Sequence, residues 1–172
     1  SSHLAGRFAL DAVDAAREQV ALAIGAHRNE IVFTSGSTES INLALKGAVA
    51  TSPSRRNVIT ISTEHKAVLD TAEWLKSNQS EVTIIPTDSA GVIDVSALED
   101  ALDEGTAVVS AMAANNETGV VTNLQELIEV SQKHGALFHS DATQAIGRLP
   151  FNVEELNLDL ASISAHKIYG PK

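Results

Sequence analysis

Residues 107–112 read AVVSAM, and residues 113–119, which follow directly, read AANNETG. The first segment is almost continuously apolar, and the second is polar and ends in glycine. A strand that is apolar on both faces is typical of a parallel sheet with helices on each side. We therefore predict that 107–112 is a buried strand whose carboxyl end opens onto a polar loop.

The segments on either side of this stretch repeat an alternation of strand and helix. Apolar residues at helical spacing over 8–24 predict a helix that ends at Gly25, and further helices are expected over 41–49, 66–76 and 124–133. Ser96 is expected to cap a helix that runs to Leu102, with Glu99 at the capping-box position. The other short apolar runs, which predict strands, are 31–34, 58–61, 82–85, 136–139 and 158–163. This order predicts an α/β fold of three layers, α/β/α, with a mostly parallel sheet.

Composition limits the possible functions. The chain has 172 residues, the usual size of one domain, and its formal net charge of -10 argues against binding a nucleic-acid backbone. It contains no cysteine, which excludes disulfides, thiolate metal sites and cysteine nucleophiles within these residues. The histidines show no spacing typical of a metal site. No apolar run approaches the ~20 residues that span a bilayer, so we expect a cytoplasmic protein.

Polar residues gather where the predicted strands end. In an open parallel sheet, ligands bind beyond the carboxyl ends of the strands. Five segments in such positions carry unusual chemistry: 34–40 (TSGSTES), 62–66 (STEHK), 113–119 (AANNETG), 140–144 (SDATQ) and 164–167 (SAHK). We expect all five to meet at one rim of the sheet and to form the functional site there.

The segment 34–40 has the form of an anion site. A glycine turn that opens a helix presents free backbone N–H groups and the positive end of the helix dipole. Ser37 and Thr38 would add hydroxyl donors to these groups. The alternative is an ordinary N-cap, because Ser and Thr are common at the start of any helix. No Gly-Lys-Ser/Thr follows, so this is not a Walker loop.

Three further residues at the rim each allow two interpretations. Asp141 follows a buried strand, where a carboxylate needs a cationic or hydrogen-bond-donating partner such as a pyridinium nitrogen. The alternative is that Asp141 is a helix N-cap. His65 offers a flat ring for stacking, or it is a loop histidine. Asn116 donates to a ring oxygen, or it shapes the turn before Gly119. By contrast, His139 lies one position before the rim and is expected to be packed in the core.

Lys167 is the most informative residue of the rim. It follows an apolar strand and has Ser164 and His166 as neighbours, which is a poor position for a surface role. A lysine whose pKa is lowered by burial and nearby charge is a nucleophile that forms an imine with an aldehyde. The alternative is a lysine whose amine reaches solvent along an apolar stem.

Taken together, the five segments resemble the cysteine desulfurases of the NifS/IscS type. These enzymes belong to the class V aminotransferase family of fold-type I pyridoxal phosphate (PLP) enzymes. The resemblance covers essentially the whole chain, and its motifs are 30–40, 63–69, 115–119, 139–144 and 164–172. It implies that the chain is the core of the large domain of a fold-type I PLP-dependent transferase.

The same resemblance implies a role for each residue of the rim. Lys167 and His65 would be catalytic: Lys167 would form the Schiff base with PLP, and His65 would stack on the ring. Asp141 would pair with the pyridine nitrogen, which strengthens the ring as an electron sink. Gln144 would bind the phenolic oxygen, and Asn116 would lie beside the ring. The phosphate would be held by Ser37, Thr38, Ser164 and His166.

The activity implied by the resemblance is conversion of L-cysteine to L-alanine, with the sulfur left as an enzyme persulfide for Fe-S cluster assembly or other sulfur transfer. Such enzymes are homodimers that pass sulfur to acceptor or scaffold proteins. Residues 1–172 would then be a partial large domain that lacks the family's N-terminal segment, C-terminal small domain and persulfide cysteine. We therefore expect this chain alone to be inactive as a desulfurase.

Two alternatives to this function stay open at the level of sequence. The first is another class V lyase or aminotransferase that acts on selenocysteine, cysteine sulfinate or kynurenine. The second is a catalytically dead fragment that serves as a binding module.

Overall fold

The structure, a computed structural model, describes residues 3–170. Ser1, Ser2, Pro171 and Lys172 lie outside the described residues, and the last two belong to the motif 164–172. Within the described part of the chain, five strands form one sheet in the order β2-β1-β3-β4-β5, and every neighbouring pair is parallel. The strands are β1 Asn57–Ile61, β2 Val82–Ile85, β3 Thr106–Ser110, β4 Leu137–Asp141 and β5 Leu160–Ser162.

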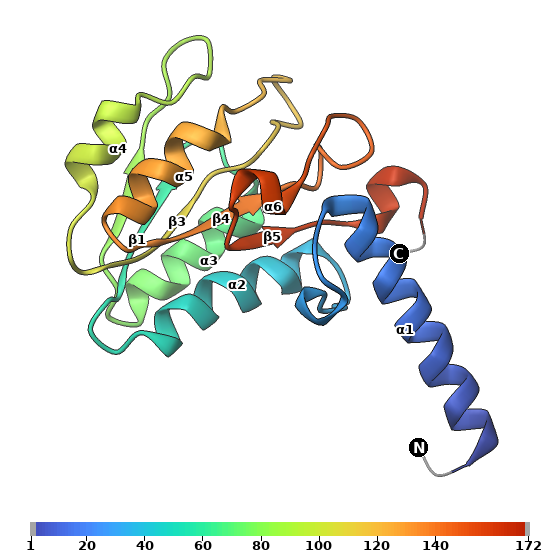
Figure 1. Cartoon of the computed structure of the whole chain (residues 1–172). Coiled ribbons are helices and arrows are strands. Elements are labelled where there is room, and N and C mark those ends of the chain that lie inside the picture. The colour runs from blue at the N-terminus through green and yellow to red at the C-terminus, as the bar shows by residue number, and fades with distance from the viewer. Residues whose placement is uncertain (1–2, 171–172) are drawn as a thin grey trace.

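Helices cover both faces of this sheet, so the predicted three-layer α/β fold with a parallel sheet is confirmed (Figure 1). Helices α2 and α3 lie on one face, and α4 and α5 lie on the other. The α-helices are α1 Leu4–Ile24, α2 Ser37–Thr51, α3 Lys66–Ser77, α4 Val95–Ala101, α5 Leu124–Lys133 and α6 Val153–Leu156. Two short 3-10 helices, η1 Arg28–Glu30 and η2 Ala165–Ile168, complete the described elements.

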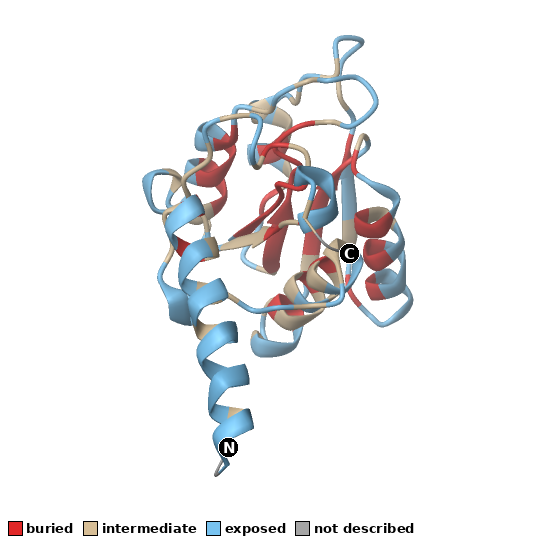
Figure 2. Cartoon of the chain, turned by 90° about the vertical axis from the view of Figure 1, so that its right-hand side faces the viewer, coloured by how far each residue is buried: buried red, intermediate tan, exposed pale blue. Residues whose placement is uncertain are grey.

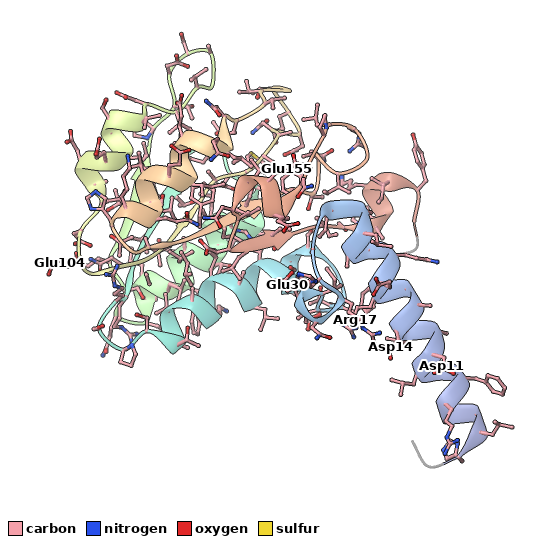
Figure 3. The ribbon with its side chains drawn as sticks, viewed as in Figure 1. Asp11, Asp14, Arg17, Glu30, Glu104 and Glu155 are labelled. Carbon is pink, nitrogen blue, oxygen red and sulfur yellow. The ribbon has the colours of Figure 1, made fainter. Side chains whose placement is uncertain are left out.

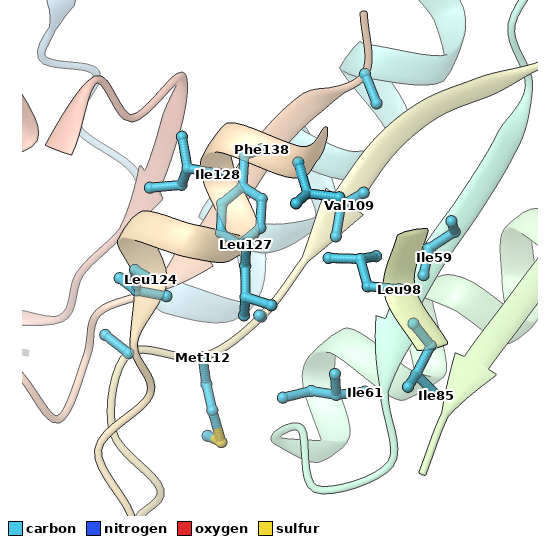
Figure 4. Packing of buried hydrophobic residues seen from close by; sticks show 14 of the residues in the cluster. Ile59, Ile61, Ile85, Leu98, Val109, Met112, Leu124, Leu127, Ile128 and Phe138 are labelled. Atoms are coloured by element: carbon cyan, nitrogen blue, oxygen red, sulfur yellow. The ribbon is translucent and has the colours of Figure 1, made fainter. Parts of the chain in front are cut away.

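Successive residues of each strand point into different layers of the core. Ile59, Val109 and Phe138 pack with the buried leucines of α4 and α5, as Figure 4 shows. The residues that precede two of them, Val58 and Val108, pack instead against α2 and α3. Because both faces are buried, the strands need apolar side chains at almost every position, and this is the pattern that made them recognisable in the sequence.

Helix α1 projects from the body of the protein, and most of its outer surface is exposed (Figure 2). Its apolar residues Phe8 and Val13 are among the exposed ones. Its C-terminal half contacts the segment that follows the helix: Arg17 donates a hydrogen bond to the carbonyl of Ile31, and Asp14 forms an ion pair with Arg28 at 3.2 Å. Figure 3 shows Asp14 and Arg17 on the inner half of the projecting helix.

The end of α1 agrees with the sequence prediction. Gly25 is the C-cap with φ of 70°, a left-handed conformation that glycine adopts without strain. A side chain at this position would also overlap Asn152, which approaches the glycine closely. Glycine is therefore required at position 25 for two reasons: the positive φ angle and the lack of space for a side chain beside Asn152.

Two local predictions are wrong. Residues 31–34 form no strand: Val32 and Phe33 are 66% and 49% exposed, and no strand of the described sheet lies beside them. A strand needs a neighbour for its hydrogen bonds, so the apolar run alone does not suffice. The N-cap of α4 is Asp94 and not Ser96, because the Asp94 carboxylate accepts a hydrogen bond from the backbone N–H of Ser96.

Phe138 is the largest fully buried side chain and offers a test of the core. Replacing it with alanine removes the ring and leaves a cavity, so we expect Phe138→Ala to lower the free energy of unfolding by roughly 3–5 kcal/mol. Leu137→Ala is the control, because Leu137 is the preceding residue and is 39% exposed. Chemical denaturation should show a much smaller loss for this control, and equal losses would contradict the described packing.

Candidate functional site

The carboxyl ends of four strands meet at one edge of the sheet, as their parallel order requires. Beyond the strands, hydrogen bonds keep the chain segments together: Ala113 N donates to the carbonyl of Asp141 at 3.0 Å. The loop after β1 is tied to the loop after β3, because Asn115 Nδ2 donates to the carbonyl of Thr63 at 2.8 Å. Polar segments that are far apart in sequence are thereby held side by side.

Asp141 is the last residue of β4 and is 5% exposed. Its Oδ1 accepts a hydrogen bond from the N–H of Thr143 at 3.0 Å, and its Oδ2 has no hydrogen-bond partner among the described residues. The segment that follows consists of turns, so Asp141 is not a helix N-cap. A buried carboxylate with one oxygen free of donors is suited to a cationic or N–H donor ligand.

Glu64 is a buried residue to which the sequence analysis gave no role. It is 6% exposed, and neither of its carboxyl oxygens has a hydrogen-bond partner among the described residues. Burial raises the pKa of Glu64 well above its usual 4.5, and the nearby Asp141 carboxylate raises it further. The backbone groups of Met112 and His65 have a smaller, opposite effect on this pKa. Its position in the strand-end segment 62–66 was the available signal, but its burial could not be read from the sequence.

His65 is the N-cap of α3, where its Nδ1 accepts a hydrogen bond from the N–H of Ala67 at 3.1 Å. The imidazole is otherwise exposed at the end of β1. A ring whose Nδ1 is engaged in this way is fixed in orientation. The cap therefore gives His65 a definite structural role at this edge, and its exposed face stays available for a planar ligand.

Asn116 is exposed in the loop after β3, and it does not shape the turn. Asn115 does so instead: its Oδ1 accepts hydrogen bonds from the N–H groups of Glu117 and Thr118, both at 2.8 Å. One of the two interpretations of Asn116 is thus corrected, because the turn is built by its neighbour. Two adjacent asparagines in sequence give no indication of which one faces the turn.

The first turn of α2 has free backbone donors. Its N-cap, Gly36, provides no side-chain cap, and the first helical hydrogen bond runs from Ser40 N to the carbonyl of Gly36 at 3.1 Å. The N–H groups of Ser37 and Thr38 therefore lie outside the helical ladder. The ordinary side-chain cap is absent here. The Glu39 carboxylate accepts a hydrogen bond from Ser35 N, which lowers the pKa of that glutamate.

Four of the predicted site residues line one cavity of about 1010 Å³. They are Ser37 and Thr38 from α2 together with Ser164 and His166 after β5. Ser164 Oγ and His166 Nδ1 form a hydrogen bond of 2.8 Å. The wall formed by these four residues therefore offers hydroxyl, imidazole and backbone donors, which is the chemistry of an anion site. Other parts of the same cavity are lined by apolar residues and by the carboxylates of Glu30, Glu39, Glu154 and Asp159.

The other predicted site residues are not among those that line this cavity, namely His65, Asn116, Asp141, Gln144 and Lys167. Lys167 lies in η2 and is exposed, so the expectation that it is buried is wrong for the described structure. It follows β5, the edge strand of the described sheet, which has no further strand to cover it. Arg148 links two of these residues, since it donates to Gln144 Oε1 at 3.1 Å and to the carbonyl of Lys167 at 2.9 Å.

A buried chain of hydrogen bonds runs below the site. His139 is completely buried, as predicted, and its Nδ1 lies 2.8 Å from Ser110 Oγ. Its Nε2 lies 2.9 Å from Ser162 Oγ, which in turn lies 2.9 Å from Ser40 Oγ. Burial lowers the pKa of His139 from 6.5 to about 4, although the nearby Asp141 carboxylate opposes this change. We refer to Ser40, Ser110, His139 and Ser162 as the serine–histidine chain.

Other kinds of site receive no support from the described part of the chain. Residues 3–170 contain no group of three or more His, Cys, Asp or Glu side chains placed to hold a metal ion. No described helix is long and apolar enough to cross a membrane.

Comparison with known proteins places these features in a family. The family model described as Aminotransferase class-V matches residues 1–172. The cysteine desulfurase IscS of Anaeromyxobacter sp. (strain Fw109-5) is 51% identical over 172 residues, which cover 99% of this chain and 43% of that protein. A solved structure named NIFS-LIKE PROTEIN has a TM-score of 0.96 at 43% identity, over 100% of this chain and 48% of that one. Another, named SspA in complex with cysteine, has a TM-score of 0.93 at 37% identity, over 100% of this chain and 50% of that one.

Glu64 predicts a pH dependence of stability. The folded state favours the neutral carboxyl, whereas the unfolded chain ionises above pH 4.5, so stability should fall as the pH rises from 4.5 towards the raised folded pKa. Glu64→Gln cannot ionise and should lose this decline. Denaturation at several pH values measures the effect, with the exposed Glu117→Gln as control. Parallel pH profiles for Glu64→Gln and the parent would contradict a neutral Glu64.

The lowered pKa of His139 predicts the opposite pH dependence of folding stability, in a lower pH range. The unfolded histidine takes up a proton below pH 6.5, whereas the folded one stays neutral to about pH 4, so stability should fall by roughly 3 kcal/mol as the pH drops through this range. His139→Asn should remove this fall. The imidazole of the parent can also be titrated directly by NMR, and a midpoint near 6.5 would show that the ring is not neutral by burial.

Proposed function

Since the chain belongs to the aminotransferase class-V family, we propose that it forms the PLP-binding core of a cysteine desulfurase. The observation that carries the proposal is the pairing of two features at one sheet edge. One is Asp141, a buried carboxylate with a free Oδ2, and the other is the donor-rich first turn of α2. A ligand with a basic ring nitrogen at one end and a phosphate at the other requires both.

The residues present fit this cofactor. Asp141 is a buried residue whose Oδ1 is engaged by Thr143 N, and its Oδ2 offers an acceptor for a protonated pyridine nitrogen. The cavity wall formed by Ser37, Thr38, Ser164 and His166 offers hydroxyl and N–H donors that suit a phosphate. We therefore propose these residues as the groups that would hold the two ends of the cofactor.

Four further residues are proposed to contact the cofactor between its ends. Lys167 would hold it covalently through its amine. His65 would lie against the ring, and Asn116 beside it. Gln144 is suited to donate to the phenolic oxygen, because Arg148 engages its Oε1 and leaves its amide nitrogen without a partner among the described residues.

When bound, the cofactor supplies an electron sink for reactions at the α-carbon of an amino acid. The chain's own part in the chemistry is binding and proton transfer. Lys167 and His65 are the proposed groups that hold and move protons near the reacting carbon. Asp141 keeps a negative charge beside the pyridine nitrogen. The thiolate that accepts sulfur must come from outside these 172 residues, because they contain no cysteine.

We propose L-cysteine as the substrate. Two findings support this: curated relatives over 99% of the chain are named cysteine desulfurase IscS, and a solved neighbour is named SspA in complex with cysteine. The chain spans less than half the length of those curated relatives, at 43% and 42%. Homodimer formation and transfer of sulfur to an acceptor or Fe-S scaffold protein are proposals for the whole protein, and the cytoplasmic location stays a prediction.

Lys167 gives the direct test of the cofactor assignment. When the purified chain is mixed with PLP, we expect an imine absorbance band that disappears in Lys167→Ala, because only the lysine amine can bond the aldehyde at this site. Lys76→Ala, which removes an exposed lysine from α3, is the matched control and should keep the band. A band that survives in Lys167→Ala, or its absence in the parent, would refute the assignment.

A further inference from the structure

One hydrogen bond joins the two halves of the anion-binding wall. Ser40 Oγ, in the first turn of α2, lies 2.9 Å from Ser162 Oγ at the end of β5. Thr38 precedes Ser40 by two residues, and Ser164 follows Ser162 by two residues. The spacing between the α2 donors and the Ser164 hydroxyl therefore depends on how firmly Ser40 and Ser162 are held together.

The bond is anchored from within the sheet. His139 Nε2 lies 2.9 Å from the same Ser162 hydroxyl, and His139 Nδ1 lies 2.8 Å from Ser110 Oγ. Ser110, His139 and Ser162 are all 0% exposed, so water does not compete for these bonds. Thr60 extends the connection to β1, because its Oγ1 donates to the carbonyl of Ser110 at 3.2 Å. The serine–histidine chain thus links β3, β4 and β5 to helix α2, and Thr60 adds the neighbouring strand β1.

The donors and acceptors of this chain are balanced with either tautomer of a neutral histidine. A neutral imidazole has one N–H donor and one acceptor nitrogen, and each serine hydroxyl has a single proton to donate. If His139 Nε2–H donates to Ser162, the Ser162 proton is free for Ser40. If Nε2 accepts the Ser162 proton instead, Ser40 must be the donor. In both cases all three groups are ordered together.

The same chain is close to the other end of the proposed cofactor site. Asp141 follows His139 by two residues on β4, so both side chains lie on the same face of the sheet. The carboxylate proposed for the pyridine nitrogen thus lies on the same strand as His139, which holds Ser162 next to the wall proposed for the phosphate. Such a network sets the distance between the two ends of a ligand before it binds.

We propose that Ser40, His139 and Ser162 are positioning residues for the phosphate group of the cofactor. They hold the free N–H groups of Ser37 and Thr38 at a fixed distance from Ser164, without touching the phosphate themselves. This inference rests on the proposed function for the identity of the ligand. It adds residues to which the family resemblance assigned no role.

The test compares two ligands that differ only in the phosphate. Ser40→Ala and Ser162→Ala each remove a hydroxyl and leave the described ligand groups in place. We expect each to weaken the binding of PLP about tenfold, the effect of one buried hydrogen bond, and to leave the binding of pyridoxal unchanged. The double variant should be no weaker than the single ones, because both remove the same link.

A matched control separates positioning from a general loss of packing. Ser131→Ala also removes a buried hydroxyl, one that donates to the carbonyl of Leu127 at 2.7 Å within α5 on the opposite face of the sheet. It should change the binding of neither ligand. The inference is overturned if PLP and pyridoxal lose affinity equally, if the two single losses add in the double variant, or if Ser131→Ala has the same effect.

A measurement without PLP keeps this inference distinct from the proposed function. Inorganic phosphate should shift the amide NMR signals of Ser37 and Thr38 in the parent chain, and Ser162→Ala should need about tenfold more phosphate for the same shift. If the parent fails to bind PLP but shows this behaviour, the proposed function fails and the positioning role stands. If the parent shows no phosphate shift, or Ser162→Ala shows it at the same phosphate concentration, the positioning role is wrong.

Discussion

Burial of both faces of the parallel sheet is the constraint on which the rest of the structure depends. Layers of helix on each side bury most of the described sheet, so the polar side chains of the site collect beyond the carboxyl ends of the strands. Asp141, Glu64 and Ser164 all lie there, and each is less than 9% exposed. A charged or polar group in such a buried position needs a hydrogen-bond or charge partner. The fold therefore produces a site at the strand ends where a polar ligand can supply such partners.

The serine–histidine chain is a polar network within the largely apolar sheet interior, and its hydrogen bonds explain why it is tolerated. Every member has a hydrogen-bond partner, so its burial leaves no donor or acceptor of His139 unsatisfied. Glu64 is different, because both of its oxygens lack a partner among the described residues. The hydrogen bonds of the serine–histidine chain stabilise a fixed geometry. The burial of Glu64 without partners is unfavourable for the charged carboxylate, so the folded state favours the neutral carboxyl.

The sequence predicted the layers and most strands because apolar runs respond to burial on both faces. It predicted α5 to the residue, since the helix has a single apolar face and a clear polar boundary. It failed for 31–34, where strand formation depends on a neighbouring strand and not on the residues themselves. The roles of Asn115 and Glu64 were missed for a similar reason, since a turn contact and a buried carboxyl depend on segments distant in sequence.

The charge of the site follows from the two shifted groups taken together. Burial favours neutral His139 and neutral Glu64, while Asp141 keeps a donor from Thr143 and acts on both as a negative charge. Protonating the histidine or ionising the glutamate would each place a second charge where few partners exist. Folding therefore disfavours a charge on His139 or Glu64 beside the Asp141 carboxylate. A protonated pyridine nitrogen carries the charge opposite to that carboxylate, which agrees with the cofactor proposed for this edge of the sheet.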